Sequence, residues 1–139
     1  MLRDEGRTIV VSTQYVGESA MCDVVAVMVE GRLLTVAPPD ELRRAAFGGD
    51  VVHVTPERGW MTAVELQAVA ALPQVVSATR DDDRVRIVLR SLDDVSSLAT
   101  HFEQAGLAVG TIDTVPPTFD EVFVALMRGA ESQAAVGVT

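Results

Sequence analysis

The stretch Val75–Arg90, "VVSATRDDDRVRIVLR", predicts a β-hairpin and decides the fold. Two runs rich in β-branched residues flank Asp81–Asp83, a short polar segment of the kind that joins antiparallel strands. In the second run apolar and charged residues alternate. Its apolar set is Val85, Ile87 and Leu89, and its charged set is Arg84, Arg86 and Arg90. This alternation predicts a sheet with one buried face and one solvated face.

The segments on either side of this hairpin repeat a strand–helix pattern. Val51–Thr55 is a predicted strand, and Thr62–Glu65 has the spacing of a capping box at the start of a helix. After the hairpin, Ser91 is a candidate cap for a second helix, and a last strand is expected at Ala108–Val115. The second helix is indicated by Val95, Leu98, Ala99 and Phe102 at helical spacing and by Gly106 at its end. The order β-α-β-β-α-β predicts an α+β fold, the ferredoxin-like sandwich.

A final helix is predicted after the proline pair that follows the last strand. Thr118–Glu121 again has the spacing of a capping box. An apolar stripe runs along this helix at Phe119, Val122, Phe123, Leu126 and Met127. We expect the stripe to be a docking surface for a partner or a cover for the chain's own sheet. Residues 130–139 show no periodicity, which predicts a mobile tail.

The first 47 residues have a different character. Thr8–Thr13 and Asp23–Val29 are continuous apolar runs without alternation, which is typical of strands covered on both faces. The small residues between the two runs predict a helix. Glu30–Arg32 is a predicted tight turn into a further run, and Pro38–Phe47 is a predicted short helix. Strands of this kind need a larger sheet around them, since an uncovered strand exposes an unpaired edge.

Composition limits the classes of function. The formal charge is −9 and all eleven basic residues are arginine. This acidity argues against nucleic-acid binding, which needs a basic surface. The chain shows no apolar run long enough to span a membrane and no signal peptide, so we expect a cytoplasmic chain without membrane insertion. Cys22 is expected to be a small buried hydrophobe.

Candidate catalytic and metal-binding residues are few. His53 and His101 have no ligating residue at suitable spacing, and Asp81–Asp83 lacks the glycine and distal glutamate of a calcium loop. Ser12 and Thr13 have no partner base. We therefore predict no catalytic residue and no metal site in this chain.

The segment Arg3–Arg44, "RDEGRTIVVSTQYVGESAMCDVVAVMVEGRLLTVAPPDELRR", resembles the end of the nucleotide-binding domain of an ABC-transporter ATPase. The following part, with "LPQVVSATR", "RVRIVL" and "PPTFDEVF", resembles the C-terminal extension on ATPase subunits of ABC-2-type, daunorubicin-resistance-type exporters. The resemblance implies a remnant of the nucleotide-binding domain at 1–47, a linker at 48–50 and a ferredoxin-like accessory domain at 51–129.

The resemblance also implies a nucleotide-sensing position at Gln14, where the family usually has a switch histidine. A neutral amide exchanges hydrogen bonds but does not carry charge near neutral pH. Three alternatives stay open: Gln14 contacts a γ-phosphate or orients water, it marks a non-hydrolysing site, or it packs at a strand end. The sequence contains no phosphate loop, signature or Walker B motif. We therefore expect no ATP hydrolysis and no cofactor in this chain alone, with ATP and Mg²⁺ held by the parent protein.

Two functions follow as hypotheses. The first is the C-terminal segment of the ATP-binding subunit of an ABC exporter. In it the accessory domain contacts the rest of the ATPase, supports a homodimer and couples its closure to the membrane-spanning permease, at the inner face of the cell membrane. The stripe Phe119–Met127 is the expected docking surface. The alternative is a freestanding ferredoxin-like regulatory module that dimerises and binds a small ligand. A third option is exchange of the first segment between two copies.

Overall fold

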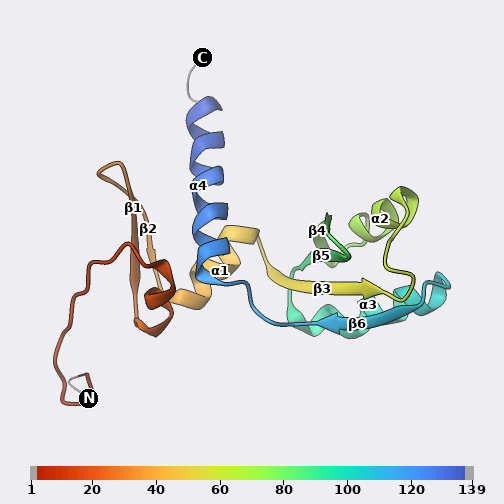
Figure 1. Ribbon diagram of the computed structural model, residues 1–139, viewed down its shortest axis with the longest axis horizontal. Helices are drawn as coiled ribbons and strands as arrows, with labels where there is room; N and C mark the ends of the chain where they lie inside the picture. Colours follow the sequence, from red (N-terminus) through yellow and green to blue (C-terminus); the bar gives the residue numbers. More distant parts are fainter. Residues whose placement is uncertain (1–2, 137–139) are drawn as a thin grey trace.

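The computed structural model describes residues 3–136, and its largest element is a four-stranded antiparallel sheet with the strand order β4-β5-β3-β6 (Figure 1). Its strands are β3 (Asp50–Pro56), β4 (Val75–Asp81), β5 (Arg84–Leu89) and β6 (Val109–Asp113). The two crossovers carry the helices α2 (Ala63–Ala70) and α3 (Val95–Gln104). This order and these pairings are those of the split βαβ arrangement. The predicted α+β, ferredoxin-like fold is confirmed.

The main core lies between this sheet and its two helices. Val85, Ile87 and Leu89 of β5 are buried, as the alternation predicts, and they pack with Leu98 and Phe102 of α3. The cluster also takes in residues of β3, β4, α2 and the connecting segments: Val52, Val54, Met61, Val69, Val75 and Leu107. One face of the sheet is therefore the buried face of a two-layer sandwich.

The opposite face of the sheet is more covered than the alternation predicts. Val51 and Val88 on this face are also buried, and Arg86 is half-buried. Arg86 is covered by Phe47, the last residue of the helix that precedes β3. The centre of the Phe47 ring lies 5.7 Å from the Arg86 guanidinium carbon. The expectation of a fully solvated face is therefore wrong around Arg86.

The start of α2 follows the predicted capping box. The Glu65 N–H donates to the Thr62 hydroxyl at 3.2 Å, and the Thr62 N–H donates to the Glu65 carboxylate at 2.8 Å. The hydrogen bond from the Thr62 backbone, together with the nearby Arg58 guanidinium, lowers the pKa of Glu65. Because the pKa is lowered, the stabilisation from this cap is present at neutral pH and is lost as the pH falls through that pKa.

Ser91 caps a short 3₁₀ turn, and not the predicted helix, which begins about one turn later. The Ser91 hydroxyl accepts a hydrogen bond from the Asp93 N–H at 3.2 Å, so it caps the short 3₁₀ turn η2 (Leu92–Asp94). Helix α3 begins only at Val95. Two adjacent carboxylates after Ser91 favour a tight turn at this point, since Asp is a common turn residue.

The N-terminal hairpin and the C-terminal helix pack together in a second unit (Figure 1). It contains η1 (Val16–Met21), β1 (Val25–Val29), β2 (Arg32–Ala37), α1 (Pro39–Phe47) and α4 (Phe119–Val136). Strands β1 and β2 form an antiparallel hairpin, and Glu30 and Gly31 at its tip both have positive φ, as a type I′ turn requires. Val27, Leu42, Phe119 and Val122 are buried together in a second hydrophobic cluster.

Three features of the N-terminal segment differ from the prediction. Thr8–Thr13 forms no strand, and Cys22 is exposed rather than buried. The predicted helix is the 3₁₀ helix η1. A strand needs a hydrogen-bonded neighbour, and in the described part of the chain β1 and β2 pair only with each other. Val27 is buried while Met28 and Leu33 are more than half exposed, so the expected cover on both faces of these strands is not met.

Helix α4 is longer than its apolar stripe. It continues to Val136, through residues for which the sequence predicts an aperiodic tail. Ala, Glu and Gln in this stretch have high intrinsic helix propensity, so the helix needs no packing stripe to continue. Residues 137–139 of the predicted tail lie outside the described residues. No helix in the described chain has the length and apolarity needed to cross a bilayer.

We expect Val51–Val115 to be much better protected from hydrogen exchange than Thr8–Val36. The first range contains the four-stranded sheet and its buried core, whereas the second contains a two-stranded hairpin, the short 3₁₀ helix η1 and a segment without regular structure. Hydrogen–deuterium exchange followed by peptide mass spectrometry measures both ranges in one sample. Equal protection of the two ranges would contradict this expectation.

Candidate interaction surface

The apolar stripe of α4 lies against the N-terminal part of the chain. Phe119 is 6% exposed and Val122 is 1% exposed, and both pack with Val27 of β1 and Leu42 of α1. Phe123 and Leu126 are half-buried against the same cluster, and Met127 is half-buried. The stripe thus joins the last helix to the first hairpin and α1 instead of covering the four-stranded sheet.

The entry into α4 is held by its predicted capping box and by α1. The Thr118 N–H donates to the Glu121 carboxylate at 2.8 Å, and the Glu121 N–H donates to the Thr118 hydroxyl at 3.4 Å. From α1, Arg43 Nε donates to the Pro117 carbonyl at 3.3 Å, and the Arg43 guanidinium lies 4.7 Å from the centre of the Phe119 ring. These contacts fix where the chain leaves the sheet and enters the helix.

Arg86 connects the sheet to α4. Its guanidinium lies 3.3 Å from the Asp81 carboxylate on β4 and 3.6 Å from the Glu121 carboxylate on α4. His53 Nε2 lies 3.4 Å from the same Asp81 carboxylate. The buried Nε of Arg86 has no hydrogen-bond partner among the described residues. The same guanidinium therefore contacts both units of the chain. We call this group, formed by His53, Asp81, Arg86 and Glu121, the polar bridge.

Sequence reasoning placed Arg86 in a solvated row and missed this bridge. Two features would have indicated the bridge: Arg86 lies opposite His53 in the pairing of β5 with β3, and a glutamate lies in the first turn of α4. Neither partner is close to Arg86 in sequence. Hydrophobic periodicity reports which face a residue occupies, but it does not report what covers that face.

Residues 38–127 match the family of the ATP-binding protein DrrA1-3-like C-terminal domain. The chain belongs to this family. The matched range contains α1, the whole four-stranded unit and the apolar stripe of α4, so the second cluster is built partly inside the DrrA1-3-like domain and partly from residues that precede it.

The chain also aligns with two relatives over more residues than the DrrA1-3-like range. The chain is 30% identical over 132 residues to the probable multidrug ABC transporter ATP-binding protein YbhF of Escherichia coli, covering 93% of this chain and 22% of that protein. It is also 30% identical over 125 residues to the daunorubicin resistance ATP-binding protein DrrA3 of Streptomyces coeruleorubidus, covering 87% of this chain and 38% of that protein. The chain thus spans well under half the length of these relatives. No solved structure matches it.

Gln14 lies before the DrrA1-3-like range, in an exposed bend between Thr8–Thr13 and η1. Its side chain makes no hydrogen bond within the described part of the chain, while the neighbouring Thr13 hydroxyl accepts one from the Tyr15 N–H at 3.0 Å. The structure does not place Gln14 in the second cluster or in the polar bridge. Its nucleotide-sensing role stays a prediction.

Apolar side chains are exposed in the region that precedes the DrrA1-3-like range. We call them the exposed apolar set, and each is more than half exposed: Ile9, Val10, Val11, Val24, Met28, Leu33 and Val36. Single exposed apolar residues are ordinary, but many on one short hairpin and its leading segment are typical of an interaction surface. Among the described residues, no group of three or more His, Cys, Asp and Glu side chains is arranged to hold a metal ion.

Proposed function

We propose that this chain is the C-terminal segment of the ATP-binding subunit of an ABC exporter and that it acts through contacts, with ATP hydrolysis carried out by the rest of the subunit. The relatives named above support this assignment, because the chain matches less than 40% of the length of either one and both names specify ATP binding. In this proposal the DrrA1-3-like domain is an interaction and regulatory domain on the nucleotide-binding part.

The exposed apolar set is the observation that carries the proposal. Its seven residues all lie before residue 38, in a segment that resembles strands of a larger sheet but forms only a two-stranded hairpin here. Burial of apolar surface stabilises by about 25 cal/mol per Å². A preceding nucleotide-binding part that supplies the missing strands would cover this set and give Thr8–Thr13 a hydrogen-bonded neighbour.

In this proposal, α4 couples movement of the nucleotide-binding part to movement of the accessory domain. Its stripe contacts the N-terminal hairpin and α1, and its first turn contacts the four-stranded unit through the polar bridge. A displacement of the nucleotide-binding part on dimer closure would move α4 and, with it, the accessory domain. The domain would then act on the homodimer partner or the membrane-spanning permease at the inner face of the membrane.

The nucleotide contact in this proposal is made by Gln14. Its amide is exposed and makes no other hydrogen bond in the described chain, so it is available to a γ-phosphate or to an attacking water. ATP and Mg²⁺ would be held by residues of the parent protein that precede this chain. The chain itself would supply this amide and the surface that positions it.

The mass of the native polypeptide tests the proposal. We expect a capture reagent directed against "TQYVGESAMCD" to recover from the host a species well above 14.8 kDa, large enough to include a nucleotide-binding domain. Intact mass spectrometry measures this directly, and a shuffled peptide serves as the control for capture. A species of 14.8 kDa alone would contradict the proposal and favour a freestanding module.

A further inference from the structure

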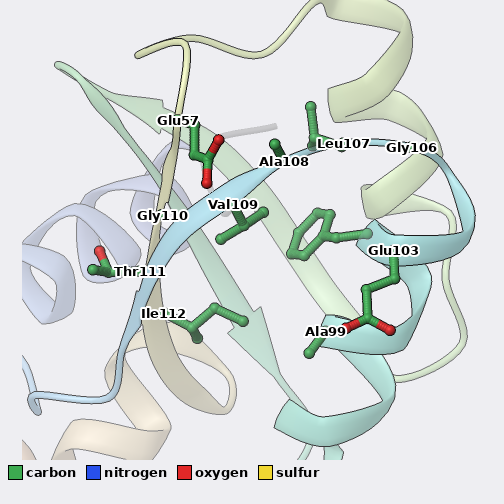
Figure 2. Close-up of a pocket in the computed structure, with 11 residues that line it drawn as sticks. Glu57, Ala99, Glu103, Gly106, Leu107, Ala108, Val109, Gly110, Thr111 and Ile112 are labelled. Atoms are coloured by element: carbon green, nitrogen blue, oxygen red, sulfur yellow. The ribbon is translucent and has the colours of Figure 1, made fainter.

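A groove of about 500 Å³ lies between the strand β6 and helix α3 (Figure 2). Its floor is apolar, because Phe102 and Leu107 belong to the main core and Val109 and Ile112 pack against that core. Its volume is in the range that accommodates several side chains of a ligand. Neither the second cluster nor the polar bridge uses any of its lining residues.

The strand that borders the groove is an edge of the sheet. In the described chain β6 pairs with β3 on one side and with no strand on the other. Natural edge strands are commonly protected by lysine, proline or a covering element. The sequence of β6, "VGTID", contains neither lysine nor proline, whereas the opposite edge strand β4 has α2 packed against it. Strand β6 is five residues long, and its pairing with β3 is irregular at Thr55/Pro56. The outer backbone groups of β6 are thus available for pairing.

The rim of the groove carries unpaired negative charge. Figure 2 shows the carboxylate of Glu57, from the loop after β3, and the carboxylate of Glu103, from α3, on opposite sides of Val109. Both side chains are exposed, and neither forms an ion pair or a hydrogen bond within the described part of the chain. Neither carboxylate is therefore neutralised by a neighbouring guanidinium.

The segment of sequence that supplies α3 and β6 is acidic as well. Between Arg90 and Arg128 the sequence contains no arginine or lysine. Its part around these two elements contains the carboxylates of Asp93 and Asp94 just before α3, of Glu103 on α3 and of Asp113 at the end of β6. A field of this sign attracts lysine and arginine side chains and repels acidic ones.

We propose that this groove binds an extended basic segment of a partner protein by β-strand addition. The segment would pair its backbone with the free edge of β6 and lie between that strand and α3. Because side chains of a strand alternate between its two sides, residues at every second position would enter the groove. An apolar side chain would occupy the floor, and a lysine or arginine two positions away on each side would meet Glu57 or Glu103.

A second copy of this chain is a poorer occupant for the groove. Its own β6 offers no basic residue, and each chain has a formal charge of −9. Pairing two copies along β6 would bring acidic rims together without a compensating positive charge. Charge complementarity therefore favours a basic partner segment.

The probe for this proposal is the peptide acetyl-Lys-Thr-Val-Thr-Lys-amide, which places lysine, valine and lysine on one side of an extended strand. We expect saturable changes in the amide NMR signals of Gly106–Ile112 and of the α3 surface in the ¹⁵N-labelled full chain. The acidic analogue acetyl-Glu-Thr-Val-Thr-Glu-amide should leave these signals unchanged. We expect Glu57→Gln/Glu103→Gln to weaken binding of the basic peptide about fivefold, the effect of losing two solvent-accessible ion pairs.

A matched variant controls for net charge. Glu41→Gln/Glu131→Gln removes the same two charges from exposed positions on α1 and α4 that do not line the groove, and it should leave the affinity unchanged. The proposal is overturned by absence of saturable changes at β6, by equal binding of the acidic peptide, or by equal weakening in both double variants. Self-association that protects β6 and excludes the peptide, measured by sedimentation equilibrium, would overturn it in favour of a second copy. None of these outcomes bears on the proposed role of the chain in an ATP-binding subunit.

Discussion

Gly49→Ala is expected to destabilise the chain by about 3 kcal/mol, at the upper end of the effects of overpacking, and to lower its melting temperature by roughly 10 °C. Gly49 is buried between α1 and β3. A Cβ atom added there would lie 2.2 Å from the Leu89 carbonyl oxygen and 3.1 Å from Val88 Cγ1. The closest atom belongs to the backbone of β5, so the clash is relieved only by moving one strand relative to its neighbour.

Gly129→Ala is the matched control for this substitution. Gly129 lies in α4, and a Cβ atom added there meets nothing within 4 Å. Alanine should stabilise this helix by about 0.5–1 kcal/mol, because glycine loses more conformational freedom on folding. Thermal unfolding followed by circular dichroism measures both variants. A Gly49→Ala variant as stable as the parent chain would show that β5 does not approach Gly49 so closely.

Val122→Asp is expected to separate the two units of the chain. Val122 is 1% exposed in the second cluster, and a carboxylate at this position would be buried without a partner among the residues around it. The cost is at least roughly 3 kcal/mol, and the second cluster is small. We expect α4 and the β1–β2 hairpin to lose protection from hydrogen exchange, while β3 to β6 keep theirs because their core contains no residue of α4.

Val124→Asp provides the comparison within the same turns of α4. Val124 is 48% exposed, so a carboxylate there keeps its water and should change stability by no more than about 0.5 kcal/mol. Peptide-resolved hydrogen exchange of the two variants gives the contrast. If Val122→Asp removed protection from β3 to β6 as well, the two clusters would unfold as one cooperative unit.

Local signals in the sequence predicted most of the four-stranded unit. The hairpin at Asp81–Asp83 and the capping boxes at Thr62 and Thr118 each depend on residues within a few positions of one another. Such signals survive in a single sequence because the side chain and the backbone group that it satisfies are neighbours. The order β-α-β-β-α-β of these elements then predicted the ferredoxin-like topology, which the structure confirms.

Features that depend on distant residues could not be predicted in the same way. Periodicity identified the buried side of α4 but not its cover, which is Val27 and Leu42 from the other end of the chain. The half-burial of Arg86 depends on Phe47 and Glu121, each remote from it in sequence. Thr8–Thr13 has the composition of a strand, but a strand also needs a neighbour, and the described chain provides none there.

The second cluster has a consequence for the order of events on the ribosome. Leu42 emerges early, whereas Phe119 and Val122 emerge only after all four strands of the larger sheet have been synthesised. Bringing the two ends of that long intervening segment together has an entropic cost. This cost becomes small once the segment has folded and holds its ends near each other. The four-stranded unit therefore assists assembly, because by folding first it brings the last helix close to Val27 and Leu42, which α4 then covers.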